Sequence, residues 1–139
     1  MSRVQLALNV SNIDAAVDFY SKLFGMEPAK RRPGYANFVI SQPPLKLVLI
    51  ENKEAAGSLN HLGVEVETTA EVNTATAHLQ QLGVETRTEE QVTCCYALQD
   101  KVWVHDPDGA PWEIYQVLGD SQVRDIKPVE VITNNCACS

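Results

Sequence analysis

Two adjacent cysteines, Cys94 and Cys95, carry the most specific chemistry in this sequence. They lie in the segment VTCCYALQDKVWV, whose composition predicts a loop followed by a strand. Neighbouring Cα atoms are about 3.8 Å apart, below the roughly 4.4 Å usual across a disulfide, so the pair suits chelation better than self-bridging. Two thiolates favour a soft centre such as trivalent arsenic, antimony, mercury or cadmium. The alternative is that one cysteine packs inward and the other is incidental.

Three further side chains could ligate a metal: Gln5, His61 and Glu113. Each lies in a predicted strand, on the face opposite the apolar side chains that would pack under a helix. One imidazole, one carboxylate and one amide oxygen would leave coordination positions open for a substrate or O₂. Taken separately, each residue has an ordinary explanation, because a lone histidine is commonly structural and a lone Glu or Gln is commonly solvated.

The elements that must position these residues follow a repeated order. Alternation over residues 4–10 predicts a half-buried strand, and Ser11-Asn12 offers helix N-cap chemistry. A helix is expected to run to Phe24 and to stop at Gly25. Its apolar stripe would be Ala16, Phe19, Tyr20, Leu23 and Phe24. Three short strands are then expected at 27–31, 35–40 and 45–51.

The second half repeats that order. A strand over 59–67 precedes a helix over 69–82, which has Val72, Ala75, Leu79 and Leu82 as its stripe and ends at Gly83. Strands over 84–89, 96–105 and 111–118 follow. The sequence therefore predicts an α+β domain over 1–118, with one module at about 2–52 and a second at about 58–118. Residues 119–139 would be a mobile tail, whose Cys136 and Cys138 either scavenge soft metal or are a chance pair.

Composition restricts the partners. The chain has 139 residues and a net charge of -7, which argues against nucleic acid and anionic membranes. Neither a signal peptide nor an apolar run of roughly 18 residues is apparent. The four cysteines are therefore expected to be reduced thiols in a cytoplasmic protein.

Several segments resemble the vicinal oxygen chelate superfamily, which includes glyoxalase I and extradiol dioxygenases. They are VQLALNVSNIDAAVDFYSKLFG, NHLGVEVE and HDPDGAPWEIYQ, within residues 2–118. The resemblance implies two βαβββ modules that form a cup-shaped mixed sheet around a divalent metal, with ligands at Gln5, His61 and Glu113. A fourth ligand of the glyoxalase I kind would have to be Glu51.

Within that superfamily, the Cys94-Cys95 pair and the segments MSRVQLALNV and AKRRPGYANF resemble the carbon-arsenic lyases. Similar sequences are also called cadmium-inducible proteins. The resemblance implies an enzyme that uses non-haem Fe(II) and O₂ to cleave trivalent organoarsenicals, such as methylarsonous acid, into arsenite and an oxidised carbon fragment. Cys94 and Cys95 would bind the substrate and take part in catalysis, and the protein could be a monomer or a homodimer.

The chemistry agrees with this resemblance. A mono-organic arsenical, R-As(OH)₂, has two exchangeable hydroxyls, so two thiolates satisfy it, whereas arsenite would prefer a third thiol. Two other readings remain: a non-catalytic protein that sequesters cadmium or metalloid, and a glyoxalase-like metalloenzyme. A glyoxalase would survive loss of both cysteines, and a sequestering protein would need no iron.

Overall fold

A computed structural model describes residues 2–122 as two compact units. The first unit is Arg3–Leu62, and the second begins at Gly63. Among the described residues no helix is long and apolar enough to cross a membrane. The expectations for the tail beyond Gln122, including Cys136 and Cys138, lie outside the described residues.

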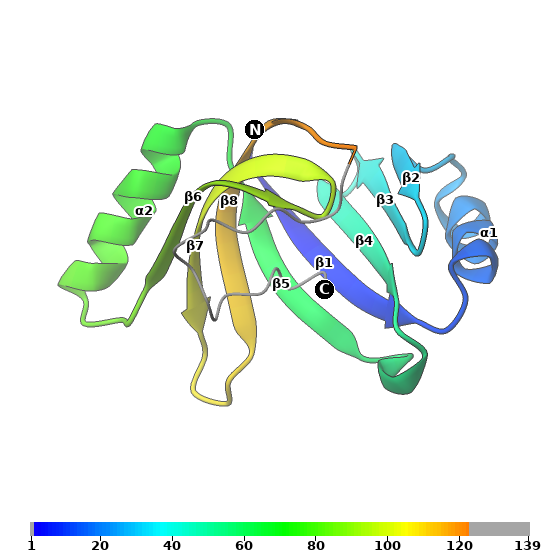
Figure 1. The fold of residues 1–139 in the computed structure, drawn as a ribbon, viewed down its shortest axis with the longest axis horizontal. Coiled ribbons are helices and arrows are strands. Elements are labelled where there is room, and N and C mark those ends of the chain that lie inside the picture. Colours follow the sequence, from blue (N-terminus) through cyan, green and yellow to red (C-terminus); the bar gives the residue numbers. More distant parts are fainter. Residues whose placement is uncertain (1, 123–139) are drawn as a thin grey trace. The chain divides into compact units, whose positions relative to one another are not determined.

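The first unit contains a mixed sheet with the strand order β2-β3-β4-β1. β1 is parallel to β4, whereas β3 is antiparallel to both of its neighbours. Helix α1 contacts β3 and β4 (Figure 1). The elements are β1 (Arg3–Val10), α1 (Ile13–Phe24), β2 (Lys30–Arg32), β3 (Tyr35–Ile40), β4 (Leu45–Glu51) and the short 3-10 helix η1 (Lys53–Ala55).

Helix α1 has the termini that the sequence predicts, and Ala16, Tyr20 and Phe24 of its predicted stripe pack on the core cluster. The Asn12 side chain accepts a hydrogen bond from the Ala15 backbone N–H, and Gly25 ends the helix at φ 65°. Ile13 and Val17 are buried, whereas Phe19 and Leu23 are 57% and 58% exposed. Their assignment to the core was therefore wrong, because Ile13 and Val17 set a face centred away from them.

The second unit contains the antiparallel order β8-β7-β6, and α2 contacts β7 and β8. Thr68 and Glu71 form a capping box at the start of α2, and Val72 is its buried side chain. Leu82 is 66% exposed and follows the helix, so its place in the predicted stripe was wrong. The elements are β5 (Leu59–Glu65), which runs across the unit boundary, α2 (Thr69–Gln81), β6 (Arg87–Cys94), β7 (Ala97–His105) and β8 (Pro111–Asp120).

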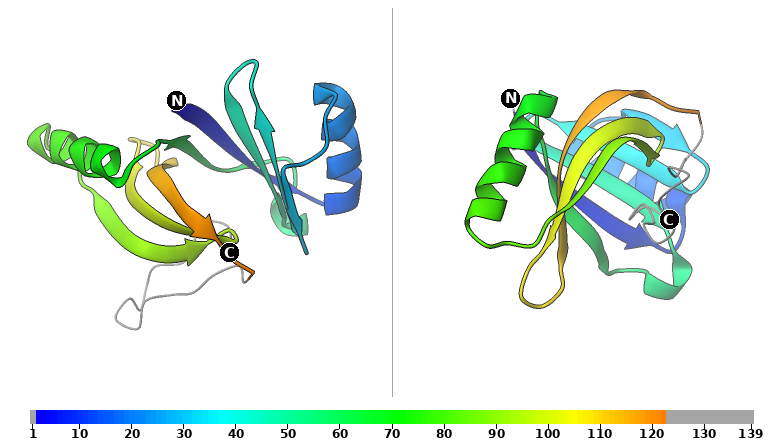
Figure 2. Two further views of the ribbon diagram at one scale, coloured as in Figure 1. Left: turned by 90° about the horizontal axis from the view of Figure 1, so that it is seen from above. Right: turned by 60° about the vertical axis from the view of Figure 1, so that its left-hand side comes forward.

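The segment that carries the cysteines is a tight hairpin rather than a loop. Figure 2 shows the ribbon of this hairpin between β6 and β7. β6 continues to Cys94, and Cys94 pairs with Ala97, so the connection consists of Cys95 and Tyr96. Both of these residues have positive φ, 52° and 63°, which is the signature of a type I′ turn. An irregularity between Glu89 and Val92 lets the strand continue where the sequence predicted its end.

The strand faces that carry the predicted ligands are more deeply buried than the apolar faces. Gln5 is 4% exposed, His61 1% and Glu113 3%. Leu6 and Leu8 on the opposite face of β1 are half-buried and pack on the cluster that includes Val17 and Leu49. The predicted alternation is thus correct, and the order β-α-β-β-β occurs twice.

Candidate metal and thiol site

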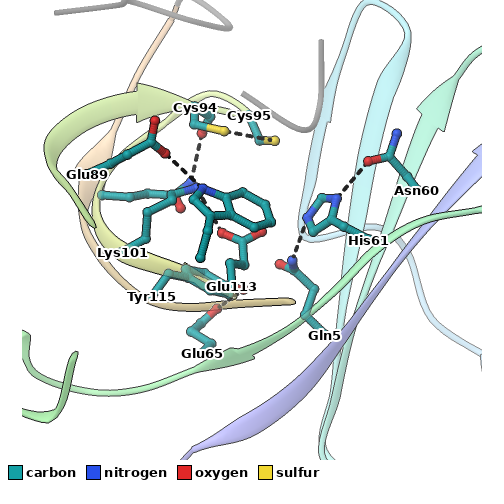
Figure 3. Close-up of polar contacts among 12 residues, drawn as sticks. Gln5, Asn60, His61, Glu65, Glu89, Cys94, Cys95, Lys101, Glu113 and Tyr115 are labelled. Carbon is teal, nitrogen blue, oxygen red and sulfur yellow. Dashed lines mark hydrogen bonds and ion pairs between the residues drawn. The ribbon is translucent and has the colours of Figure 1, made fainter. Parts of the chain in front are cut away.

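Gln5 and His61 lie together in the first unit (Figure 3). The side-chain nitrogen of Gln5, Nε2, is 3.2 Å from His61 Nε2, and both side chains are buried. β1 and β5 supply these residues from sequence positions 56 apart. The structure therefore brings together two of the three side chains that the sequence predicts as metal ligands.

Asn60 determines which imidazole nitrogen of His61 has a lone pair. Its carbonyl oxygen Oδ1 is 2.7 Å from His61 Nδ1. Because an amide oxygen can only accept a hydrogen bond, Nδ1 must carry the proton and donate it. Nε2 is then the basic nitrogen and accepts the hydrogen bond from Gln5 Nε2. A histidine that binds a metal ion does so through an unprotonated nitrogen such as this one. For Gln5 to bind the same metal ion, its side-chain amide would have to rotate so that the oxygen replaces the nitrogen.

Glu113 lies in the second unit, where it forms a buried ion pair that the sequence did not reveal. Lys101 Nζ is 2.8 Å from Glu113 Oε1, and the side chains are 1% and 4% exposed. The register of β7 and β8 explains the contact. Trp103 lies opposite Glu113, and Lys101, two residues before Trp103, lies on the same face and diagonal to Glu113. The ammonium of Lys101 therefore compensates the charge of the predicted carboxylate ligand.

Aromatic side chains surround this ion pair within the second unit. Lys101 Nζ lies 5.4 Å from the centre of the Trp103 ring and 5.8 Å from that of Tyr115, within reach of a cation–π interaction. The Trp103 indole N–H donates to Glu89 Oε1 at 2.9 Å, and the Tyr115 hydroxyl donates to Glu65 Oε1 at 3.2 Å. These contacts hold the rings and the cation in fixed positions.

The hairpin turn brings the two cysteine sulfurs close to each other. Cys94 Sγ and Cys95 Sγ are 3.6 Å apart (Figure 3), well beyond the roughly 2.05 Å of a disulfide bond to each other. Both cysteines are nevertheless disulfide-bonded in this structure, so the expectation of reduced thiols is wrong for these two residues, and chelation requires their reduction. Two thiolates that share a tetrahedral zinc ion at about 2.3 Å lie roughly 3.8 Å apart, so the observed spacing suits a chelate. Side chains of consecutive strand residues point to opposite faces, and the positive φ of Cys95 removes that alternation here.

The hairpin is also held by side chains beyond the turn. Gln99 Nε2 donates to the carbonyl oxygen of Cys94 at 2.8 Å, and the Ser121 backbone N–H donates to the carbonyl oxygen of Tyr96 at 2.9 Å. Asp100 accepts at 2.7 Å from the backbone N–H of Gln91, where the strand is irregular. These bonds place Cys94 and Cys95 at a defined point of the second unit.

Three other side chains that could in principle bind a metal, those of Glu51, His78 and His105, have a structural role or are exposed. Glu51 Oε2 accepts from the Ile13 backbone N–H at 2.9 Å and so caps α1. His78 and His105 are exposed.

Within residues 2–122, no three His, Cys, Asp or Glu side chains gather into a group that could hold a metal. The predicted set contains only two such side chains, His61 and Glu113, together with the amide of Gln5. Each is buried, and the Nδ1–H tautomer of His61 suits ligation. The donor types thus fit a divalent metal, and their assignment as ligands stays a prediction.

Sequence reasoning missed Lys101 and Asn60. The alternation of β7 places Lys101 on one face with Trp103, which could have shown that it neighbours Glu113 once the hairpin register was known. Asn60 precedes His61, so strand alternation alone would send its side chain to the other face. Only the tertiary structure shows that Asn60 contacts the imidazole.

Two named proteins are similar in sequence to most of this chain. The trivalent organoarsenical cleaving enzyme of Thermomonospora curvata is 60% identical over 122 residues, which cover 87% of this chain and 81% of that protein. The cadmium-induced protein CadI of Mycobacterium bovis is 59% identical over 122 residues, covering 88% of this chain and 80% of that protein.

A solved structure supports the fold independently. The Mn(II)-bound glyoxalase from Novosphingobium aromaticivorans superposes with a TM-score of 0.60 at 19% identity, covering 94% of this chain and 44% of that one. The paired β-α-β-β-β units confirm the predicted vicinal oxygen chelate fold class. The model of the Glyoxalase/Bleomycin resistance protein/Dioxygenase superfamily matches residues 3–114. The chain therefore belongs to the Glyoxalase/Bleomycin resistance protein/Dioxygenase superfamily.

Proposed function

We propose that this protein cleaves the carbon-arsenic bond of trivalent organoarsenicals, with Fe(II) as its cofactor and O₂ as its co-substrate. The observation that carries the proposal is the pair of sulfurs of Cys94 and Cys95, 3.6 Å apart in a defined turn. The name of the Thermomonospora curvata relative, which is 60% identical, agrees with this substrate class.

Substrate capture by the two cysteines is a ligand exchange at arsenic. Once a thiol reductant has reduced Cys94 and Cys95, their two thiols replace the two hydroxyls of R-As(OH)₂ and release two water molecules, so the organic group remains the third substituent. Thiolates are the preferred ligands of such a soft centre. The turn holds Cys94 and Cys95 at a chelating distance, which lowers the entropy lost when the second sulfur binds.

The proposed metal ligands are Gln5, His61 and Glu113. His61 would bind through Nε2, because Nδ1 donates to Asn60. Gln5 would bind through its amide oxygen and Glu113 through its carboxylate, with Lys101 as the neighbouring cation. When bound, a ferrous ion supplies the one-electron chemistry that lets O₂ react with a closed-shell substrate.

The overall reaction balances without another reactant. Methylarsonous acid, CH₃As(OH)₂, and one O₂ contain the atoms of one formaldehyde and one arsenous acid, As(OH)₃. The carbon-arsenic bond breaks, carbon is oxidised, and both oxygen atoms of O₂ enter the products. No external reductant is therefore needed.

Product formation from methylarsonous acid tests the proposal. The protein is loaded with Fe(II) under argon and then exposed to air, and arsenite, formaldehyde and O₂ uptake are measured. We expect one arsenite per O₂ consumed, and loss of product in His61→Ala, Cys95→Ser and iron-free samples. His78→Ala is the matched control, because His78 is an exposed histidine on α2.

Sequestration of cadmium or metalloid is the second candidate function, favoured by the same thiol pair and by the name of the Mycobacterium bovis relative. It predicts tight binding of Cd(II) or the arsenical without iron, O₂ or turnover. If the iron-loaded protein binds methylarsonous acid through Cys94 and Cys95 but forms no arsenite in air, cleavage is overturned and sequestration is supported.

A further inference from the structure

A chain of polar side chains leads from the buried His61 to exposed Ser58 and a backbone carbonyl within the first unit. Asn60 Nδ2 donates to Asn9 Oδ1 at 3.0 Å, and Asn9 Nδ2 donates to Ser58 Oγ at 2.9 Å. The Ser58 hydroxyl donates to the carbonyl oxygen of Ala55 at 2.5 Å. With the 2.7 Å contact between Asn60 Oδ1 and His61 Nδ1, four side chains form one continuous series.

The direction of every hydrogen bond in this series follows from its last acceptor. A backbone carbonyl cannot donate, so the Ser58 hydroxyl must donate to Ala55 and can then accept from Asn9. Asn9 therefore presents its nitrogen to Ser58 and its oxygen to Asn60. Asn60 in turn presents its nitrogen to Asn9 and its oxygen to His61, so His61 Nδ1 has to be the protonated nitrogen.

Gln5 meets the imidazole from its other side in agreement with this assignment. Gln5 Nε2 is 3.2 Å from His61 Nε2, an arrangement that needs a lone pair on Nε2. The backbone also holds the series in place, since the Asn9 N–H donates to Ser58 O and the Gly57 N–H donates to Asn9 O, each at 2.9 Å. Both sides of the ring therefore require the same tautomer.

We propose that Asn60, Asn9 and Ser58 act as a positioning relay, which transmits the fixed polarity of the Ala55 carbonyl to His61 and holds the imidazole in its Nδ1–H tautomer. The relay keeps the Nε2 lone pair available for a divalent cation. This inference deepens the proposed function and rests on it only in naming His61 as a ligand. Partners of this kind orient metal-binding histidines in other proteins, where their loss typically lowers metal affinity by about 10–100-fold.

The tautomer of His61 can be measured in metal-free protein by long-range ¹H–¹⁵N correlation on a ¹⁵N-labelled sample. We expect a pyrrole-type shift for Nδ1 and a pyridine-type shift for Nε2. Asn60→Leu removes the acceptor and should shift the population towards the Nε2–H form, whereas Asn60→Asp retains an acceptor and should preserve Nδ1–H. An unchanged tautomer in Asn60→Leu would overturn the positioning role of Asn60.

Two further variants separate the relay from a general loss of stability. Ser58→Ala removes the link to Ala55, so the amide of Asn9 is no longer oriented and the Nε2–H population should rise. No change in Ser58→Ala would overturn the relay beyond Asn60. Asn12→Ala removes the N-cap of α1 and so destabilises the first unit, but it should leave the His61 tautomer unchanged. A change in that control would assign the effect to destabilisation.

Affinity for Co(II), measured by competition with a chromophoric chelator, provides the metal readout. Asn60→Leu should weaken Co(II) binding by about 10–100-fold, whereas Asn60→Asp, which keeps an acceptor for Nδ1–H, should weaken it by less than about 10-fold. If His61→Ala binds Co(II) as tightly as the parent, the ligand role in the proposed function fails. The tautomer measurement still supports or overturns the relay, because it is made without metal.

Discussion

Lys101 and Glu113 form an ion pair in which Nζ and Oε1 are 2.8 Å apart and both side chains are almost completely buried. Removing one partner of a buried pair typically costs about 3–5 kcal/mol, because the other charge remains in a poorly solvated position. Lys101→Met should therefore lower the free energy of unfolding by that amount. The double variant Lys101→Met with Glu113→Leu should recover most of the loss. Urea denaturation of metal-free protein measures both.

The exposed pair of Lys22 and Asp18 is the matched control for that experiment. Its atoms are 2.9 Å apart, but the side chains are 75% and 67% exposed. Lys22→Met should change stability by about 0.3–0.5 kcal/mol, as is usual for exposed helix pairs. Similar effects of Lys101→Met and Lys22→Met would contradict the burial of the Lys101–Glu113 pair.

Binding of a monophenyl trivalent arsenical should depend on both cysteines of the turn. The second thiolate binds intramolecularly, so Cys94→Ser or Cys95→Ser should weaken affinity by about 10²–10⁴-fold. All samples are titrated after thiol reduction, and His78→Ala, at an exposed position on α2, is the control whose affinity should equal that of the parent. Calorimetric titration distinguishes these cases, and full affinity in either single turn variant would exclude chelation by the vicinal pair.

The type I′ turn makes a specific prediction at Tyr96, whose φ is 63°. Asparagine tolerates this left-handed region, whereas a β-branched residue does not. Tyr96→Val should therefore be less stable than Tyr96→Asn by about 1–2 kcal/mol, although the two side chains are similar in size. Equal denaturation midpoints for the two variants would rule out the positive φ at this position.

Phe38 and Phe19 provide a paired test of the core in the first unit. Phe38 is fully buried and Phe19 is 57% exposed. Phe38→Ala should cost about 3–5 kcal/mol, whereas Phe19→Ala should cost about 0.5 kcal/mol or less. Thermal or urea unfolding compares them directly. A large loss for Phe19→Ala would restore the apolar stripe that the sequence suggested.

Local patterns in the sequence predicted most of the fold. Alternation marked the strands, Asn12 and Gly25 marked the ends of α1, and β3 and β4 have their predicted bounds. These features depend on near neighbours along the chain, which is why they can be read without tertiary information. The same alternation placed Gln5, His61 and Glu113 on the faces that the structure shows to be buried.

Tertiary structure decided the contacts that give these residues their chemistry. The distance between the sulfurs of Cys94 and Cys95 depends on the hairpin register and on two positive φ angles, which no local propensity indicates for Cys-Tyr. Lys101 reaches Glu113 because β7 pairs with β8 in one register.

By itself the sequence determined which side chains are available, and on which strand face each one lies. It could not determine their partners. Asn60 contacts His61 although the two are adjacent in a strand, and Asn60 in turn donates to Asn9, 51 positions away. Hydrogen-bond direction, tautomer and charge pairing are properties of atoms that meet only after the strands have paired. For that reason the sequence identified the candidate ligands, and the folded structure determined their chemical state.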